Sequence, residues 1–62
     1  MAKVFEVNVD SRIYAGEHER FYIKARSAGE ASRRALTLAR RNGFLNKRSI
    51  YVESIKLIGE LQ

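Results

Sequence analysis

Eight of the 12 cationic side chains in this chain are arginines. Of the 62 residues, 12 are Lys or Arg and seven are Asp or Glu, which gives a formal net charge of +5 at pH 7. Arg presents a planar fork of donors that suits phosphate and carboxylate groups. The arginines are Arg12, Arg20, Arg26, Arg33, Arg34, Arg40, Arg41 and Arg48. This set predicts an anionic partner, although a charged surface that only keeps a small protein soluble has the same composition.

Four arginines are spaced so that they share the polar side of a helix: Arg33, Arg34, Arg40 and Arg41. The pairs 33/40 and 34/41 are each seven residues apart, which is about two helical turns. Lys47 and Arg48 follow shortly after the last of them. We expect these six cations to contact phosphates of duplex or structured nucleic acid. The alternative is a solvated helix face, in which Arg40 and Arg41 offset the negative C-terminal end of the helix dipole.

A second set of cations alternates along a segment with strand periodicity. Its outward side chains are Arg20, Tyr22, Lys24 and Arg26. An aromatic ring between cations on a sheet is typical of single-strand binding, in which bases stack on rings and phosphates meet cations. Tyr14 and Tyr51 would extend this surface. Glu6, Asn8 and Asp10 of a neighbouring strand share the same face, however, and would pair with the cations. An ordinary polar sheet face with a charge-protected edge strand is therefore the alternative.

No arrangement of residues predicts catalysis. The chain has no Cys, and its one His, His18, cannot form the multi-ligand cluster of a zinc site. Nucleophilic catalysis needs a base that a third group orients, and His18 lies among Glu17, Glu19 and Arg20, which favours an exposed surface residue. No glycine-rich phosphate loop is present. We therefore expect a protein that is not an enzyme and has no cofactor, no metal and no small-molecule substrate.

Hydrophobic periodicity defines the elements that would position these side chains. Residues 3–10 and 17–26 alternate between apolar and polar side chains, which predicts two half-buried strands. The inward side chains are Phe5, Val7 and Val9 in the first strand and Phe21, Ile23 and Ala25 in the second. Because the connection between the two strands is short, we expect them to pair as a hairpin.

The segment after the second strand is typical of a helix. Ser27 and Glu30 have the spacing of a capping box, in which the Ser side chain accepts from the Glu amide and Glu30 reaches back. Asn42–Gly43 predicts the helix end. The residues that gather in one apolar arc are mostly small: Ala28, Ala31, Ala35, Leu38 and Ala39. This stripe predicts a helix that packs closely against a sheet, with Leu36 off its edge.

Residues 49–58 predict a third strand whose alternation is imperfect. Ile50 and Val52 are at even positions, whereas Ile55 and Leu57 are at odd positions, so in a regular strand the two pairs would point to opposite faces. A β-bulge near Glu53–Ser54 would place all four side chains on one face. Alternatively, both faces of this strand are covered, as they would be in a dimer.

Together the elements predict an α+β fold, a ββαβ two-layer sandwich. The helix would cover one face of a three-stranded, mainly antiparallel sheet of order 2-1-3, and residues 1–62 would form a single small basic domain. So small a chain buries only about 60% of its unfolded surface, and it has no Cys for disulfides, so we expect a homodimer. No apolar run has the length of a membrane span or signal peptide, which predicts a cytoplasmic protein without a membrane partner.

The strand 21–25 that runs into the capping box and alanines of 27–31 is similar to a pattern in small ββαβ proteins. These include archaeal ribosomal proteins of the LX type and short proteins encoded by phages and plasmids. The resemblance covers most of the chain. The ribosomal family implies RNA binding by basic residues, and it assigns no role to an individual residue here.

The sequence therefore favours a non-enzymatic module that binds nucleic acid, either DNA or RNA. The arginine-rich helix face would be the main surface and the basic, tyrosine-bearing strand face the second. The alternative is a protein-interaction or inhibitor module of phage or plasmid type. Such a module would act on a host protein through an exposed strand edge or would set its arginine face against an acidic partner.

Overall fold

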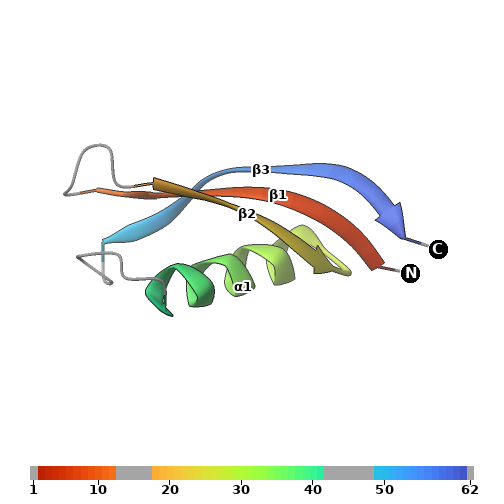
Figure 1. Ribbon diagram of the computed structural model, residues 1–62, viewed down its shortest axis with the longest axis horizontal. Helices are drawn as coiled ribbons and strands as arrows, with labels where there is room; N and C mark the ends of the chain where they lie inside the picture. The colour runs from red at the N-terminus through yellow and green to blue at the C-terminus, as the bar shows by residue number, and fades with distance from the viewer. Residues whose placement is uncertain (1, 13–17, 42–48, 62) are drawn as a thin grey trace.

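The strands and the helix follow one another along the chain in the order that the sequence predicts. The computed structural model describes residues 2–12, 18–41 and 49–61. They form strand β1 (Ala2–Ser11), strand β2 (His18–Ala25), helix α1 (Ala28–Arg41) and strand β3 (Ile50–Leu61) (Figure 1). β1 lies between β2 and β3 and is antiparallel to both. α1 covers one face of this sheet, and no other described element covers the opposite face (Figure 1), which we call the open face. The predicted ββαβ fold of order 2-1-3 is confirmed.

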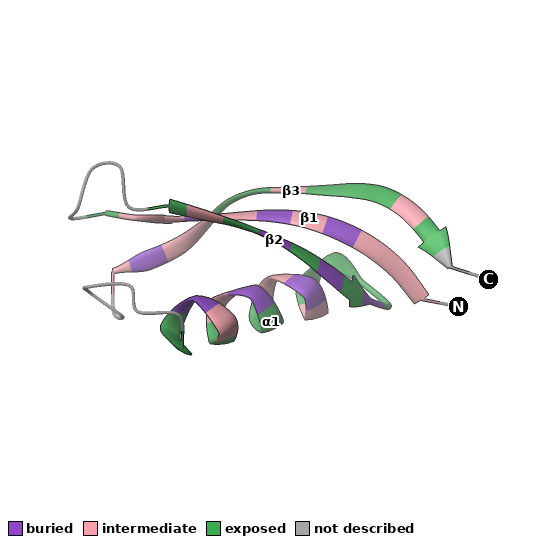
Figure 2. Ribbon diagram, viewed as in Figure 1, coloured by how far each residue is buried: buried purple, intermediate pink, exposed green. Residues whose placement is uncertain are grey.

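The hydrophobic core lies between the sheet and the helix (Figure 2). All six inward strand residues predicted from alternation are buried: Phe5, Val7, Val9, Phe21, Ile23 and Ala25. The helix contributes Ala31, Ala35 and Ala39, each 0% exposed. Leu36 and Leu38 flank this alanine stripe and pack, half-buried, against the core. Because protein interiors are close-packed, the small alanine side chains bring the helix backbone near the sheet.

α1 begins where the capping box predicts. Ser27 Oγ accepts the backbone N–H of Glu30 at 3.2 Å. Glu30 Oε1 accepts the N–H of Arg26 at 3.2 Å, one residue earlier than the usual return bond of a capping box. Ala28, predicted in the apolar stripe, is exposed in the first turn, so the buried stripe starts one turn later. The predicted helix end at Asn42–Gly43 lies outside the described residues.

The third strand contains the predicted bulge and a second one. Asn8 pairs with Ser54 but Val9 pairs with Val52, which leaves Glu53 as the extra residue. A similar shift between the partners of Val4 and Phe5 makes Ile58 the second extra residue. As a result, the four apolar residues of β3 with mismatched parity face the helix side: Ile50, Val52, Ile55 and Leu57. The bulge at Glu53 thus accounts for the imperfect alternation without a covered second face.

Candidate nucleic-acid interface

The four helix arginines lie on the side of α1 that faces solvent. Because the alanine stripe faces the sheet, Arg33, Arg34, Arg40 and Arg41 are all exposed (Figure 2). We call these four residues the arginine face. At a rise of about 1.5 Å per residue, the pairs 33/40 and 34/41 each span about 10 Å along the helix. The arginine face therefore presents two rows of cations side by side.

Of the four, only Arg34 has an acidic partner within the described part of the chain. Its Nη2 lies 3.7 Å from Glu30 Oε1, one helical turn away. Arg33, Arg40 and Arg41 form no salt bridge with any described residue. Because α1 holds these four cations and one acid, Glu30, its net charge is +3. Most of this charge is therefore available to an external anion.

The open face of the sheet carries a network of polar side chains that pair across the strands. Arg20 Nε lies 3.2 Å from Glu6 Oε1 and donates to Asn8 Oδ1 at 3.2 Å. Asn8 Nδ2 donates to Ser54 Oγ at 2.9 Å, and the Tyr22 hydroxyl donates to Glu6 Oε1 at 3.5 Å. The side chain of Tyr22 and the charge of Glu6 raise the pKa of Arg20 above its ordinary value. As the alternative predicted, an acid of β1, Glu6, pairs with a cation of this face, Arg20.

A cation–π contact extends the open face at β3. The guanidinium carbon of Arg12 lies 5.2 Å from the centroid of the Tyr51 ring. The sequence suggested Tyr51 as part of an aromatic platform, but it did not pair this ring with Arg12. Sequence spacing gives no signal for the pair, because 38 residues separate the two side chains. The Arg12 guanidinium covers a ring that base stacking would need.

The remaining predicted residues fall into three groups. Lys24 is exposed at the end of β2 and forms no salt bridge among the described residues. Arg26, predicted as an outward residue of the strand, follows β2, which ends at Ala25. The reason is that Glu30 of the helix cap binds the Arg26 N–H, so the chain leaves the sheet there. Lys47, Arg48 and Tyr14 lie outside the described residues.

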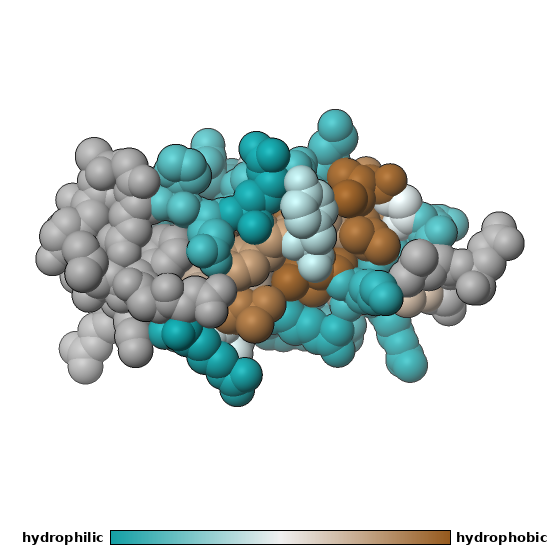
Figure 3. All heavy atoms as spheres, viewed as in Figure 1, coloured by the Kyte–Doolittle hydropathy of each residue, from teal (hydrophilic) through white to brown (hydrophobic). Residues whose placement is uncertain are grey.

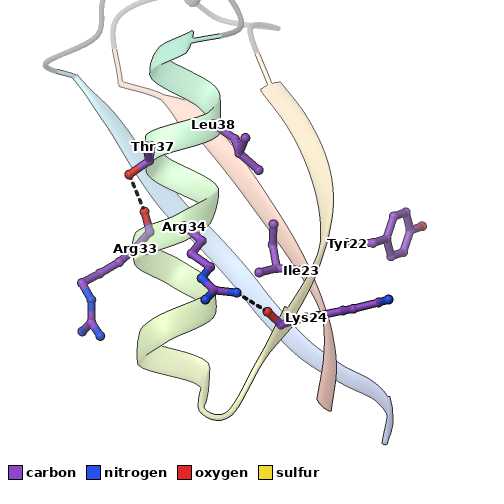
Figure 4. A pocket seen from close by; sticks show the side chains of 7 residues that line it. All are labelled: Tyr22, Ile23, Lys24, Arg33, Arg34, Thr37 and Leu38. Atoms are coloured by element: carbon purple, nitrogen blue, oxygen red, sulfur yellow. Dashed lines mark hydrogen bonds between the residues drawn. The ribbon is translucent and has the colours of Figure 1, made fainter. Parts of the chain in front are cut away.

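A cleft that the sequence did not predict runs between β2 and α1. It has a volume of about 560 Å³ and is lined by Tyr22, Ile23, Lys24, Arg33, Arg34, Thr37 and Leu38 (Figure 4). The side chains of Ile23, Leu38 and Arg34 lie between β2 and α1, whereas the Arg33 side chain points away from β2 (Figure 4). The side chains of Tyr22 and Lys24 point away from the helix (Figure 4). On the corresponding side of the molecule, a band of apolar surface lies between hydrophilic areas (Figure 3).

At this cleft one hydrogen bond links the helix to the edge of β2. Arg34 Nη1 donates to the backbone carbonyl of Lys24 at 2.6 Å, so the helix reaches the edge of β2 (Figure 4). The outward side chains of β2, Tyr22 and Lys24, still point away from the helix, so the two basic sets stay on different sides of the molecule (Figure 4). Sequence signals for the cleft existed, since Arg34 and Leu38 are one turn apart and both lie to one side of the alanine stripe. Only the position of the helix over β2 shows what they face.

Comparisons of this chain with models of protein families, with curated proteins and with solved structures each gave no match. The resemblance to the LX type of ribosomal protein stays a prediction.

Within the described ranges, no helix is long and apolar enough to cross a membrane. The same ranges contain no group of three or more His, Cys, Asp or Glu side chains that could hold a metal ion.

Proposed function

We propose that this protein is a non-enzymatic nucleic-acid-binding module and that the arginine face of α1 holds phosphates. One observation supports this function above all others. Three of the four helix arginines are exposed and have no acidic partner among the described residues, and they lie on a capped helix. The open face is a weaker candidate, because Arg20 is paired with Glu6 and the Tyr51 ring is covered by Arg12.

Phosphate binding by this face would depend on charge and would be insensitive to base sequence. Each phosphate that a cation neutralises releases counterions, so affinity falls as the salt concentration rises. Contacts to phosphates position a protein on nucleic acid but carry no sequence information. Lys47 and Arg48, which follow the helix in the sequence, would add two contacts, which gives about six in total.

The test is a salt titration of affinity, measured by fluorescence anisotropy with labelled duplex DNA and an RNA hairpin. About six phosphate contacts predict a slope near −5 in a plot of log affinity against log salt. The double variant Arg33→Ala/Arg40→Ala removes two contacts, so we expect its slope to be shallower by about two.

The matched control is Arg12→Ala/Arg20→Ala, which removes the same charge from the sheet. We expect it to keep the slope of the unmodified protein, because those side chains are occupied within the fold. Equal losses for both double variants would show that net charge alone, and not the arginine face, determines the affinity. No measurable binding of either nucleic acid at about 50 mM salt would contradict the proposed function.

A further inference from the structure

We infer that Arg34 positions the helix and does not bind the ligand, so that Arg33, Arg40 and Arg41 supply the phosphate contacts of α1. The assignment of phosphate contacts rests on the proposed function, whereas the role of Arg34 in the fold does not. The observation behind both is that two neighbouring arginines, Arg33 and Arg34, differ in the acceptors that they find within the chain.

The guanidinium of Arg34 has two acceptors, one in β2 and one in α1. Its Nη1 donates to the backbone carbonyl of Lys24 at 2.6 Å, and its Nη2 lies 3.7 Å from Glu30 Oε1. Figure 4 shows the side chain extending from the helix to the strand. A planar fork of donors can hold two acceptors at once. Both terminal nitrogens of Arg34 are therefore engaged within the fold.

Glu30 links Arg34 to the chain at the end of β2. The same Oε1 atom that pairs with Arg34 also accepts the backbone N–H of Arg26 at 3.2 Å. Arg34 thus contacts the strand directly, at Lys24, and is connected through Glu30 to a residue that follows the strand. We call this set of groups the clamp: the side chains of Arg34 and Glu30, the Lys24 carbonyl and the Arg26 N–H.

Arg33 lies one residue earlier on the helix but takes no part in the clamp. Its side chain points away from β2 (Figure 4) and forms no salt bridge with any described residue. Arg40 and Arg41, in the last turn of α1, also lack an acidic partner in the described part of the chain. Arg34 would have to release two acceptors before it could bind a phosphate, whereas the other three would release none. Binding by those three therefore costs less.

The clamp matters because the side chains that pack the helix on the sheet are small. The three buried alanines bring α1 close to the strands, but methyl groups form shallow ridges that interlock little with their neighbours. Leu36 and Leu38 beside them are only half-buried. A charge-assisted hydrogen bond from the helix to Lys24 has a defined direction, so it helps to fix the place of α1 over β2. That place determines where the other arginines of the arginine face point.

The test compares Arg33→Ala with Arg34→Ala, which remove the same charge from neighbouring positions of one helix. Circular dichroism gives their melting temperatures without any ligand. Because the gain in helix propensity is the same for both, the difference between them reports the clamp. We expect Arg34→Ala to melt about 4 °C below Arg33→Ala, as the loss of one hydrogen bond from a domain of this size predicts. Equal melting temperatures would overturn the positioning role.

Two further measurements address the clamp directly. Loss of the hydrogen bond should move the ¹³C resonance of the Lys24 carbonyl upfield in Arg34→Ala and leave it in place in Arg33→Ala. Arg34→Lys keeps the charge but has no fork, so we expect its melting temperature to lie between those of Arg34→Ala and the unmodified protein. A Lys variant as stable as the unmodified protein would overturn the clamp, because charge alone would then be sufficient.

The salt titration of nucleic-acid binding tests the assignment of phosphate contacts. With Arg34 committed to the fold, the contacts number about five, and the expected slope is about −4.5. We expect a slope shallower by about one for Arg33→Ala. Arg34→Ala should keep the slope of the unmodified protein and lose affinity about threefold, because the remaining arginines are less well positioned.

A slope shallower by about one in Arg34→Ala would assign this side chain to the ligand and overturn the inference. Failure of the proposed function gives a different result. In that case the unmodified protein would bind neither nucleic acid, while the melting temperatures and the Lys24 resonance would still decide the role of Arg34 in the fold.

Discussion

The arginines of this protein differ mainly in the acceptors that each one finds within the chain. Arg20 is held by Glu6 and Asn8, and Arg34 by Glu30 and a backbone carbonyl. Arg33 lies one residue before Arg34 but has no acidic partner among the described residues. Exposed ion pairs contribute little to stability, so the lack of an acidic partner at an arginine lowers the stability of the fold only slightly. The unpaired arginines are therefore suited to binding a ligand.

Ser27 gives the first prediction at the scale of a single residue. Its hydroxyl accepts the N–H of Glu30, which would otherwise lack an acceptor in the first turn of α1. Replacing an N-cap Ser by Ala costs about 1 kcal/mol, which lowers the melting temperature of a domain this small by about 4–8 °C. We therefore expect Ser27→Ala to lower the melting temperature measured by circular dichroism.

Ser32→Ala provides the matched control for the cap, because it makes the same substitution inside the helix. Ala has a higher helix propensity than Ser, so this variant should be neutral or slightly stabilising. An unchanged melting temperature for Ser27→Ala would contradict the role given to the cap.

At the scale of elements, the sequence predicted what depends on local patterns. Alternation identified the inward residues of β1 and β2, and the parity change in β3 identified the bulge at Glu53. The second bulge, at Ile58, was not predicted. Apolar residues around it occupy both odd and even positions, so alternation gives no signal there. Nor was the β2–α1 cleft, which depends on where the helix lies across the sheet. The departure of Arg26 from β2 depends on a side-chain acceptor that alternation does not detect.

The alanine stripe gives the prediction for helix packing. Ala35 is 0% exposed between α1 and the sheet, so a larger side chain there has no space. Overpacking a core typically costs about 1–3 kcal/mol. We expect Ala35→Leu to lower the free energy of unfolding by about this amount, as measured by urea denaturation.

Ala28→Leu makes the same substitution at an exposed position of the same helix. We expect it to change the free energy of unfolding by no more than about 0.5 kcal/mol. If both variants unfolded at the same urea concentration, the close packing of α1 on the sheet would be disproved.

At the scale of the whole molecule, charge and apolar surface are separated. α1 has a net charge of +3, whereas β3 carries Lys56 against Glu53 and Glu60. The same strand has two exposed large apolar residues, Leu57 and Ile58, each 47% exposed. β3 is also an edge strand that pairs with β1 alone in the described chain. We therefore propose that the expected homodimer forms along β3.

Light scattering over a range of concentrations tests this dimer. We expect a mass that approaches twice 7.1 kDa as the concentration rises. Ile58→Lys should keep the protein monomeric, because it places a charge in the apolar contact. Tyr22→Lys changes an exposed residue of the opposite edge in the same way and should still dimerise. A mass of 7.1 kDa for the unmodified protein at every concentration would contradict the proposal.

The narrow alanine stripe has a consequence for how this protein can evolve. Only three of the 14 residues of α1, the alanines 31, 35 and 39, are fully enclosed by the fold. Substitutions at the exposed helix positions change no core contact and are usually within about 0.5 kcal/mol of neutral. Descendants of this chain can therefore acquire a different binding specificity through surface mutations alone, while they inherit the same fold.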